Sequence, residues 1–393
     1  MGLDLYAHAG RPIELQHLHW RDMAPMPISK LDDDAFTRVR IVLMAALEHG
    51  AVEFAHAASL AAGEWREPLA RLRRIEWHQA LAVQALLGAD HSLLELSVSC
   101  KQCSIEVTAA LARQEPDAGV AAALRFSLIE EFDHLYRLVA LLDRVEGQDA
   151  NNLLQSYTDI LPGRPTILQH RAPQDDLRRP CDAATARAAT RIHVLVLLAL
   201  SRRLGALFAQ AAWRHADPLV RQLHAEIASI AEQHATQYAS LLDPRAGWLE
   251  QWLLQQAGEA LAYHCCVQHE SEPRVKALWE RMLEFEIGQF HVVAELFHAY
   301  SGQDPQRVVP RDLPEMLAFS SQRDTVRKVL GEELERSASG SAYVPRGQES
   351  QATRDYRAQV NAEGSPSEAV GAGYTWSPGT ELARWHAAAA TTP

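Results

Sequence analysis

Residues 124–142 read LRFSLIEEFDHLYRLVALL, and this stretch decides the fold. Its apolar residues recur every three or four positions, which is the period of one face of an α-helix. Glu131 lies on that apolar face between Leu128 and Leu135, and His134 follows three residues later on the same face. A carboxylate in an apolar core is costly unless it is neutralised or coordinated. The stretch therefore predicts a long helix that carries a Glu-x-x-His pair into a core.

The same helical period continues on both sides of this stretch, whereas strand-like alternation is missing. An acidic cap, Asp32-Asp33-Asp34, precedes the first helix, and breakers such as Asp243-Pro244 separate later ones. Eight helices are predicted, pairing as hairpins one to four: roughly 36–62 with 66–88, 91–113 with 117–146, 183–214 with 217–242, and 247–271 with 273–301. The expected class is all-α.

The predicted domain organisation has five parts. An extended N-terminal arm covers residues 1–35, and the first pair of hairpins covers 36–146. A proline-rich connector without a helical stripe, 147–182, leads to the second pair of hairpins over 183–301. The remaining residues, 302–393, are expected to form an irregular, partly disordered tail, which is rich in Ser, Gly, Ala and Pro after about residue 335.

The four hairpins share one plan. In each, one inward position is followed 28 to 30 residues later by two inward positions at i and i+3. The motif Gly147-Gln148-Asp149 recurs at residues 302–304, which indicates an internal repeat. Hairpin by hairpin, the inward positions are Glu48, Glu76 and Gln79; Lys101, Glu131 and His134; Ser201, Ala231 and His234; and Gln256, Glu286 and Gln289.

This plan resembles the ferritin-like superfamily, which includes ferritins, rubrerythrins and manganese catalases. In such proteins two helical hairpins each supply a Glu and a Glu-x-x-His motif to one metal centre. The resemblance covers residues 36–301 and implies tandem four-helix bundles, with 147–182 as the crossover that joins hairpins two and three. Hairpins one and four would then form a second bundle. Sequential pairing of one with two and three with four is the alternative, and a haem-oxygenase-like helical fold is another.

The resemblance also implies a metal centre, for which half of the ligand positions keep a Glu or His. The first-choice metal ligands are Glu131, His134 and His234, because two imidazoles and one carboxylate are the ligand set of mononuclear non-haem iron. A buried Glu–His hydrogen bond is the alternative interpretation, and Lys101 can supply a cation's charge by pairing with Glu131. The substituted ligand positions are Gln79, Lys101, Ser201, Ala231, Gln256 and Gln289.

The second-choice metal ligands are Glu48, Glu76 and Glu286. Three buried acids repel one another, so a hard cation or shared protons must stabilise them. Salt bridges to an arginine such as Arg202 or Arg203 are the alternative. The expected cofactor is iron or manganese, although a metal-free protein is consistent with the reduced ligand set.

Three functional hypotheses follow. The first is a ferritin-like iron or manganese oxidoreductase; its co-substrate, O2 or peroxide, is implied by the resemblance alone. The second is a degenerate, metal-free pseudoenzyme that serves as a scaffold or partner-binding module. The third is a protein that binds a small molecule in the emptied interior of a bundle.

Composition limits the partners of the chain. It has 393 residues, and 38 Lys and Arg against 50 Asp and Glu give a net charge of −12, which argues against nucleic acid and anionic membranes as partners. Neither a signal peptide nor a membrane span is predicted, and five cysteines do not suggest a disulfide framework. A cytoplasmic protein is therefore expected. The resemblance adds a homo-oligomer to the expectations.

Overall fold

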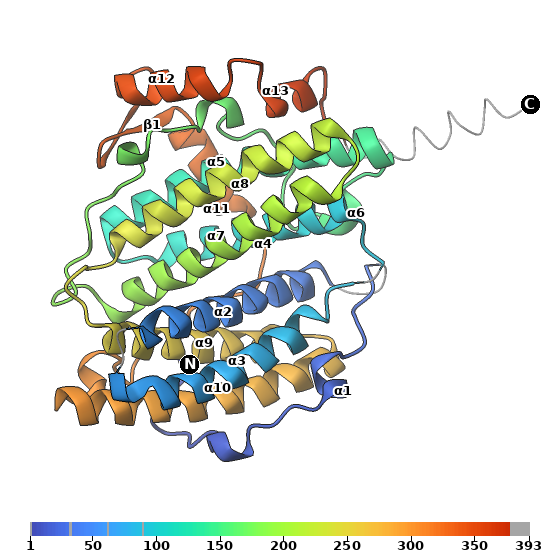
Figure 1. The fold of residues 1–393 in the computed structure, drawn as a ribbon. Coiled ribbons are helices and arrows are strands. Elements are labelled where there is room, and N and C mark those ends of the chain that lie inside the picture. Colours follow the sequence, from blue (N-terminus) through green and yellow to red (C-terminus); the bar gives the residue numbers. More distant parts are fainter. Residues whose placement is uncertain (1, 31–33, 61–62, 89, 378–393) are drawn as a thin grey trace, which may run out of the picture.

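Eight long helices, paired as four hairpins, make up most of the computed structural model (Figure 1). It describes residues 2–30, 34–60, 63–88 and 90–377. The predicted helices agree with the observed ends to within five residues, and the all-α class is confirmed because the described residues contain one small strand pair only. The hairpins are α2 (Ala35–Ser59) with α3 (Arg66–Gln84), α4 (Leu93–Gln114) with α5 (Ala118–Glu146), α7 (Ala188–Arg214) with α8 (Pro218–Leu241), and α9 (Trp248–His269) with α10 (Pro273–Ser301).

Side-chain caps explain where several of these helices begin. The Asp34 carboxylate accepts a hydrogen bond from the backbone of Phe36 at the start of α2, while Asp32 and Asp33 lie outside the described residues. Ser92 and Glu95 form a reciprocal capping box at the start of α4. Each such cap satisfies backbone N–H groups that the first helical turn leaves without a partner.

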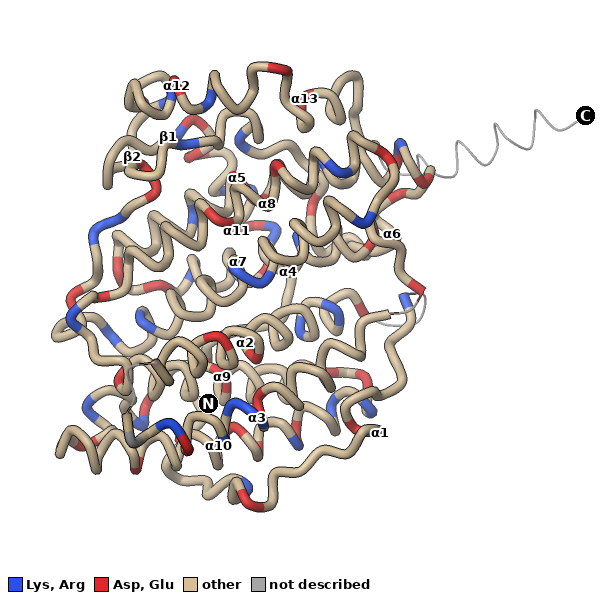
Figure 2. The backbone as a smooth tube through the Cα atoms, in the orientation of Figure 1, with Lys and Arg blue, Asp and Glu red and all other residues tan. Residues whose placement is uncertain are grey.

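The hairpins form two groups of four helices. Helices α2, α3, α9 and α10 lie together in the lower half of Figure 1, and α4, α5, α7 and α8 lie above them. Hairpin one thus lies beside hairpin four, and hairpin two beside hairpin three. Basic and acidic residues are interspersed along both groups (Figure 2).

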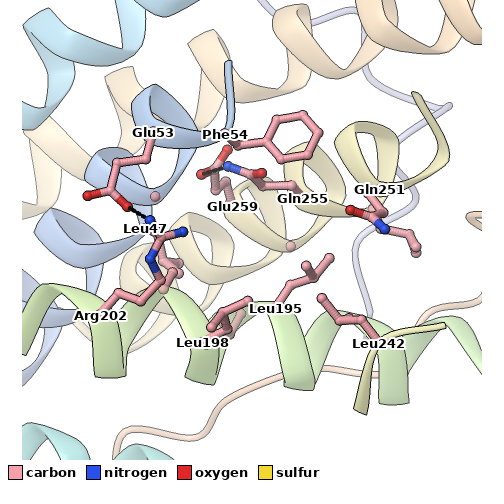
Figure 3. A pocket seen from close by; sticks show the side chains of 15 residues that line it. Leu47, Glu53, Phe54, Leu195, Leu198, Arg202, Leu242, Gln251, Gln255 and Glu259 are labelled. Carbon is pink, nitrogen blue, oxygen red and sulfur yellow. Dashed lines mark hydrogen bonds and ion pairs between the residues drawn. The ribbon is translucent and has the colours of Figure 1, made fainter. Parts of the chain in front are cut away.

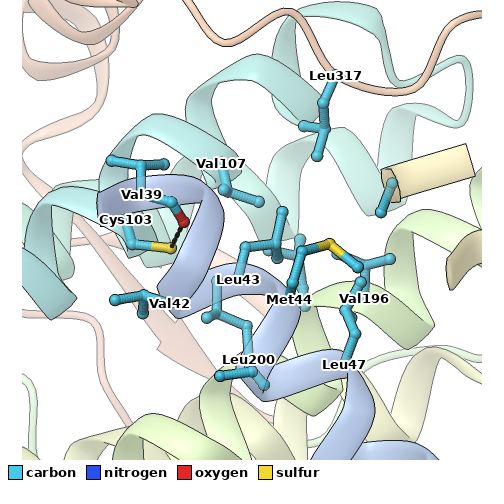
Figure 4. Packing of buried hydrophobic residues seen from close by; sticks show 14 of the residues in the cluster. Val39, Val42, Leu43, Met44, Leu47, Cys103, Val107, Val196, Leu200 and Leu317 are labelled. Atoms are coloured by element: carbon cyan, nitrogen blue, oxygen red, sulfur yellow. Dashed lines mark hydrogen bonds between the residues drawn. The ribbon is translucent and has the colours of Figure 1, made fainter. Parts of the chain in front are cut away.

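Helix α2 packs against helices of both groups. Its apolar residues, including Val39 and Leu43, pack against Val107 of α4 and Val196 and Leu200 of α7 (Figure 4). Burying one aliphatic side chain of this size contributes about 1.5–3 kcal/mol. By length and composition α2 and α7 are also apolar enough to cross a membrane, but α2 is largely buried in this core. Length and composition are therefore only weak evidence that these helices span a membrane.

The N-terminal arm runs along α10. It contains two short helical turns, η1 (Ile13–Leu15) and α1 (Trp20–Met23). The Arg11 N–H donates to the Glu284 carbonyl oxygen at 2.7 Å, and the Gln16 amide donates to the Phe285 carbonyl oxygen at 2.9 Å. Gly10 has a φ of +63°, and a Cβ there would lie 2.3 Å from the Gly288 nitrogen. Close backbone approach therefore requires glycine at this position.

The C-terminal segment is more regular than the predicted irregular tail. It contains η5 (Pro305–Arg307), α11 (Arg323–Glu333), the antiparallel strands β1 (Arg336–Ser339) and β2 (Ala342–Pro345), α12 (Gln351–Val360) and α13 (Pro366–Gly371). Buried Asp175 of the connector accepts hydrogen bonds from the Gly340 N–H at 2.5 Å and from the hydroxyls of Ser350 and Thr353. Hydrogen bonds between polar residues produce no periodic apolar pattern in the sequence. The ordered C-terminal segment was therefore not predicted. Residues 378–393 of the predicted tail lie outside the described residues.

The connector itself agrees with prediction in having no long helix. It contains only the short turns α6 (Asn151–Leu154), η3 (Thr166–Leu168) and η4 (Pro173–Asp175). Three of its arginines are nevertheless buried: Arg164, Arg171 and Arg178. The connector thus brings positive charge to the upper helix group as well as joining its two hairpins.

Candidate metal centre

The first-choice residues meet in the interior of the upper group. The Glu131 carboxylate of α5 lies 2.5 Å from the Lys101 ammonium of α4 and 3.0 Å from the His234 Nδ1 of α8. The His134 Nδ1 is 3.9 Å from the same carboxylate. The sequence pattern therefore placed these four side chains on the correct faces of their helices.

Lys101 occupies the position that a cation would take beside Glu131. Its side chain is fully buried, and its ammonium lies 4.8 Å from the centre of the Phe208 ring of α7. Phe208, rather than the half-buried Ser201, thus faces Lys101 from this helix, while Ala231 is buried on α8. Burial alone raises the pKa of Glu131, but Lys101 and the two histidines hold it well below its usual value.

A neighbouring acid, Glu130, was missed by the sequence analysis. Its carboxylate accepts from the His234 Nε2 at 2.9 Å and from Arg171 of the connector at 2.6 Å. Despite burial, Arg171, His234 and Arg164 lower the pKa of Glu130 to about 2. The pattern gave no signal for Glu130, because its arginine partners come from a segment without helical period.

The contacts of His234 argue against metal ligation in the upper group. Burial lowers its pKa, but hydrogen bonds to Glu130 and Glu131 outweigh this and raise it above its usual value. Both ring nitrogens thus point at carboxylates, as in a charged imidazolium, which has no lone pair for a metal. Lys101, His234 and Arg171 already balance Glu130, Glu131 and Asp176, which pairs with Arg171 at 2.9 Å, so this cluster does not need an ion.

The second-choice residues form a different kind of cluster in the lower group. Glu48 of α2, Glu76 of α3 and Glu286 of α10 are all buried, and one oxygen from each lies within 4.8 Å of the others. The alternative interpretation, a salt bridge from one of these acids to Arg202, is wrong, because Arg202 pairs with Glu53. The chain therefore brings three acids together at the contact between hairpins one and four.

Neutral groups surround these acids. The Gln79 amide donates to Glu48 at 3.1 Å and to Glu286 at 2.6 Å, and the Gln256 amide donates to Glu76 at 2.8 Å. The second oxygen of each acid, Oε2, has no donor among the described residues while the carboxyls are ionised. Three of the six substituted positions thus serve this cluster: Gln79, Gln256 and Gln289, whose amide donates to the Gln79 oxygen at 2.8 Å.

Two further residues of the cluster come from α9 and were missed. The Glu259 carboxylate accepts from Gln256 at 2.9 Å, and the Tyr263 hydroxyl donates to Glu48. Both lie on the face of Gln256, at i+3 and i+7. That spacing was the available signal, but the repeat plan assigned only one inward position to this helix.

The pKa values show how poorly these acids tolerate charge. Burial, and repulsion from neighbouring acids, raise the pKa of Glu48, Glu259 and Glu286 well above the usual range. Burial raises that of Glu76 to about 7, although hydrogen bonds from Glu48 and Gln256 oppose the shift. Without a cation, the cluster must therefore hold protons at neutral pH.

Comparison with known proteins assigns no family. No protein-family model matches the sequence, and neither a curated protein nor a solved structure shows significant similarity to the chain. The ferritin-like relationship therefore stays a prediction. Function has to be argued from the two polar clusters themselves.

Proposed function

We propose that this chain is a metal-binding protein of the ferritin-like kind, with its centre at Glu48, Glu76 and Glu286. The observation that carries the proposal is the convergence of three buried carboxylates within 4.8 Å, each with one oxygen that lacks a donor. A divalent cation bound by these three carboxylates would cancel their mutual repulsion and replace the protons that burial otherwise requires.

Between the two expected metals, the donor set favours manganese over iron. The converging ligand atoms are all oxygens, and carboxylate sites without imidazole suit Mn²⁺, Mg²⁺ and Ca²⁺ better than the histidine-containing sites of mononuclear iron. The amide oxygens of Gln256 and Gln289 are buried without a donor and offer further oxygen atoms. Bound manganese or iron would supply redox and Lewis-acid chemistry, and the oxidoreductase hypothesis rests on that property.

The upper cluster is then the counterpart of this centre in which fixed charges replaced the ion. Lys101 stands at the repeat position that Glu48 occupies in hairpin one. Its ammonium contacts Glu131 directly, as a cation would. We infer that this half of the molecule supports the fold, while the lower half carries the chemistry.

A metal-free scaffold or partner-binding protein is the second candidate function. It is favoured by the raised pKa values of the lower cluster, because protons alone can neutralise those acids. The two candidates differ in whether a metal accompanies the folded chain.

Metal content after expression in medium with added manganese and iron tests the choice. Wild-type protein should retain roughly one ion per chain, and Glu48→Gln and Glu286→Gln should lose it. Glu106→Gln is a matched control, since Glu106 is a buried acid with a raised pKa that is bonded to Thr158 outside the cluster. Metal far below one equivalent in wild type, or equal metal in all four proteins, would favour the scaffold.

A further inference from the structure

A cavity of about 210 Å³ lies beside the carboxylate cluster (Figure 3). Its walls come mainly from α2, α7 and α9, so it lies where the lower helix group meets hairpin three. Glu259, a member of the cluster, is also a lining residue. Gln256 bonds both Glu259 and Glu76, so two hydrogen bonds link this lining residue to one of the proposed ligands.

The cavity has an apolar body and a polar wall. The apolar lining includes Leu47, Phe54, Leu195, Leu198, Leu242 and Leu254. At the exposed side, Arg202 and Glu53 form an ion pair of 2.8 Å and neutralise each other. On α9, the Glu259 carboxylate accepts one hydrogen bond at each oxygen, from Gln255 at 3.4 Å and from Gln256 at 2.9 Å. Each carboxylate oxygen has a further lone pair, so a third donor can still bind.

Size and charge define the occupant. An apolar protein cavity of roughly 150 Å³ is enough for benzene, so this larger one can hold a molecule of about nine or ten non-hydrogen atoms. The neighbouring acids disfavour an anion, and the apolar walls disfavour a cation. A neutral molecule with one donor meets both conditions.

We propose that this cavity binds a neutral, mainly hydrocarbon small molecule and that Glu259 accepts a hydrogen bond from its single donor group. The proposal deepens the proposed function, on which it rests for the view that the bound molecule is a substrate of the carboxylate centre. Binding itself depends only on the cavity, so the two claims can fail separately.

Indole and indene are a matched pair of probes, because they share shape and size but only indole carries an N–H. Calorimetric titration of the full chain should show indole binding at least about fivefold tighter than indene. Leu195→Trp, which fills the cavity from a half-buried wall position, should weaken indole at least about tenfold. Leu207→Trp, a half-buried position of the same helix outside the cavity, should not weaken it.

Proximity to the metal is tested by nuclear relaxation. Protons of bound indole should relax faster in protein loaded with paramagnetic Mn²⁺ than in protein loaded with Mg²⁺, and Leu195→Trp should abolish the difference. Binding that is absent, or equal in wild type and Leu195→Trp, would overturn the cavity proposal whatever the metal content. Indole binding with the expected variant pattern in a chain that takes up no metal would uphold the cavity and overturn the proposed function instead.

Discussion

Lys101 and Glu48 occupy the same position of the predicted helical repeat, and they have opposite effects on the neighbouring acids. Lys101 brings a positive charge to Glu131, whose pKa falls well below its usual value once burial is outweighed. Glu48 adds a further acid to Glu76 and Glu286, and its pKa rises through burial and their repulsion. The residue at this one position, lysine or glutamate, thus determines whether the cluster needs a bound ion.

Replacement of Lys101 should show how strongly an unpaired buried carboxylate destabilises the fold. In Lys101→Met, Glu131 loses its closest cation, and we expect the free energy of unfolding to fall by about 3–5 kcal/mol. The double variant Lys101→Met/Glu131→Gln removes the unpaired charge and should recover most of that loss. Urea denaturation measures both, and a double variant no more stable than the single one would contradict this role of Lys101.

The metal-free protein should lose stability as pH rises. A carboxyl whose pKa is raised in the folded state binds its proton more tightly there than in the unfolded chain. This preference stabilises the fold at low pH, and the stabilisation is lost as the pH rises from the unfolded-state pKa, near 4.5, to the folded-state pKa. For Glu76 that window ends at about 7. The melting temperature of the chelated protein should therefore fall from pH 5 to pH 7.5. Added Mn²⁺ should restore the lost stability, and the fall should be smaller in Glu76→Gln. A flat profile in wild type would count against protonated acids.

Among the elements, the eight long helices and their inward faces were predictable from sequence, because burial imposes the 3.6-residue period directly on apolar positions. Which hairpins lie together was not predictable, because the long connector was compatible with a crossover and with sequential pairing. The contacts that were missed involve segments without period: Arg171 reaches Glu130 from the connector, and Asp175 holds the C-terminal strands. Glu259 was missed for another reason, since the repeat plan gave α9 a single inward position.

Asp175 provides a test of how the C-terminal segment is held. Asp175→Ala removes one acceptor from three donors in β1–β2 and α12, so amide hydrogen exchange of residues 336–360 should speed up while α4 is unaffected. Asp182→Ala is the control, because Asp182 is an exposed acid of the same connector that pairs with Arg245. Equal exchange in the two variants would mean that apolar packing alone holds the segment.

On the scale of the whole molecule, the two helix groups neutralise their buried acids in different ways. In the upper group, Lys101 of α4 and Arg171 of the connector neutralise the buried acids. In the lower group, neutral glutamines and Tyr263 surround four acids. Helix α2 belongs to the lower group and packs on the upper one. A metal-bound lower group should therefore stabilise the entire chain and not only its own hairpins.

Titration of chelated full-length protein with Mn²⁺, followed by the electron paramagnetic resonance signal of the free ion, tests the central claim most directly. Wild-type protein should take up roughly one Mn²⁺ per chain with an affinity that increases with pH, since binding displaces protons from the acids. Glu286→Gln should bind at least about tenfold more weakly, while Lys101→Met/Glu131→Gln and Glu106→Gln match wild type. Equal uptake by Glu286→Gln and wild type, or uptake lost in a folded Lys101→Met/Glu131→Gln variant instead, would contradict the assignment of the metal centre to Glu48, Glu76 and Glu286.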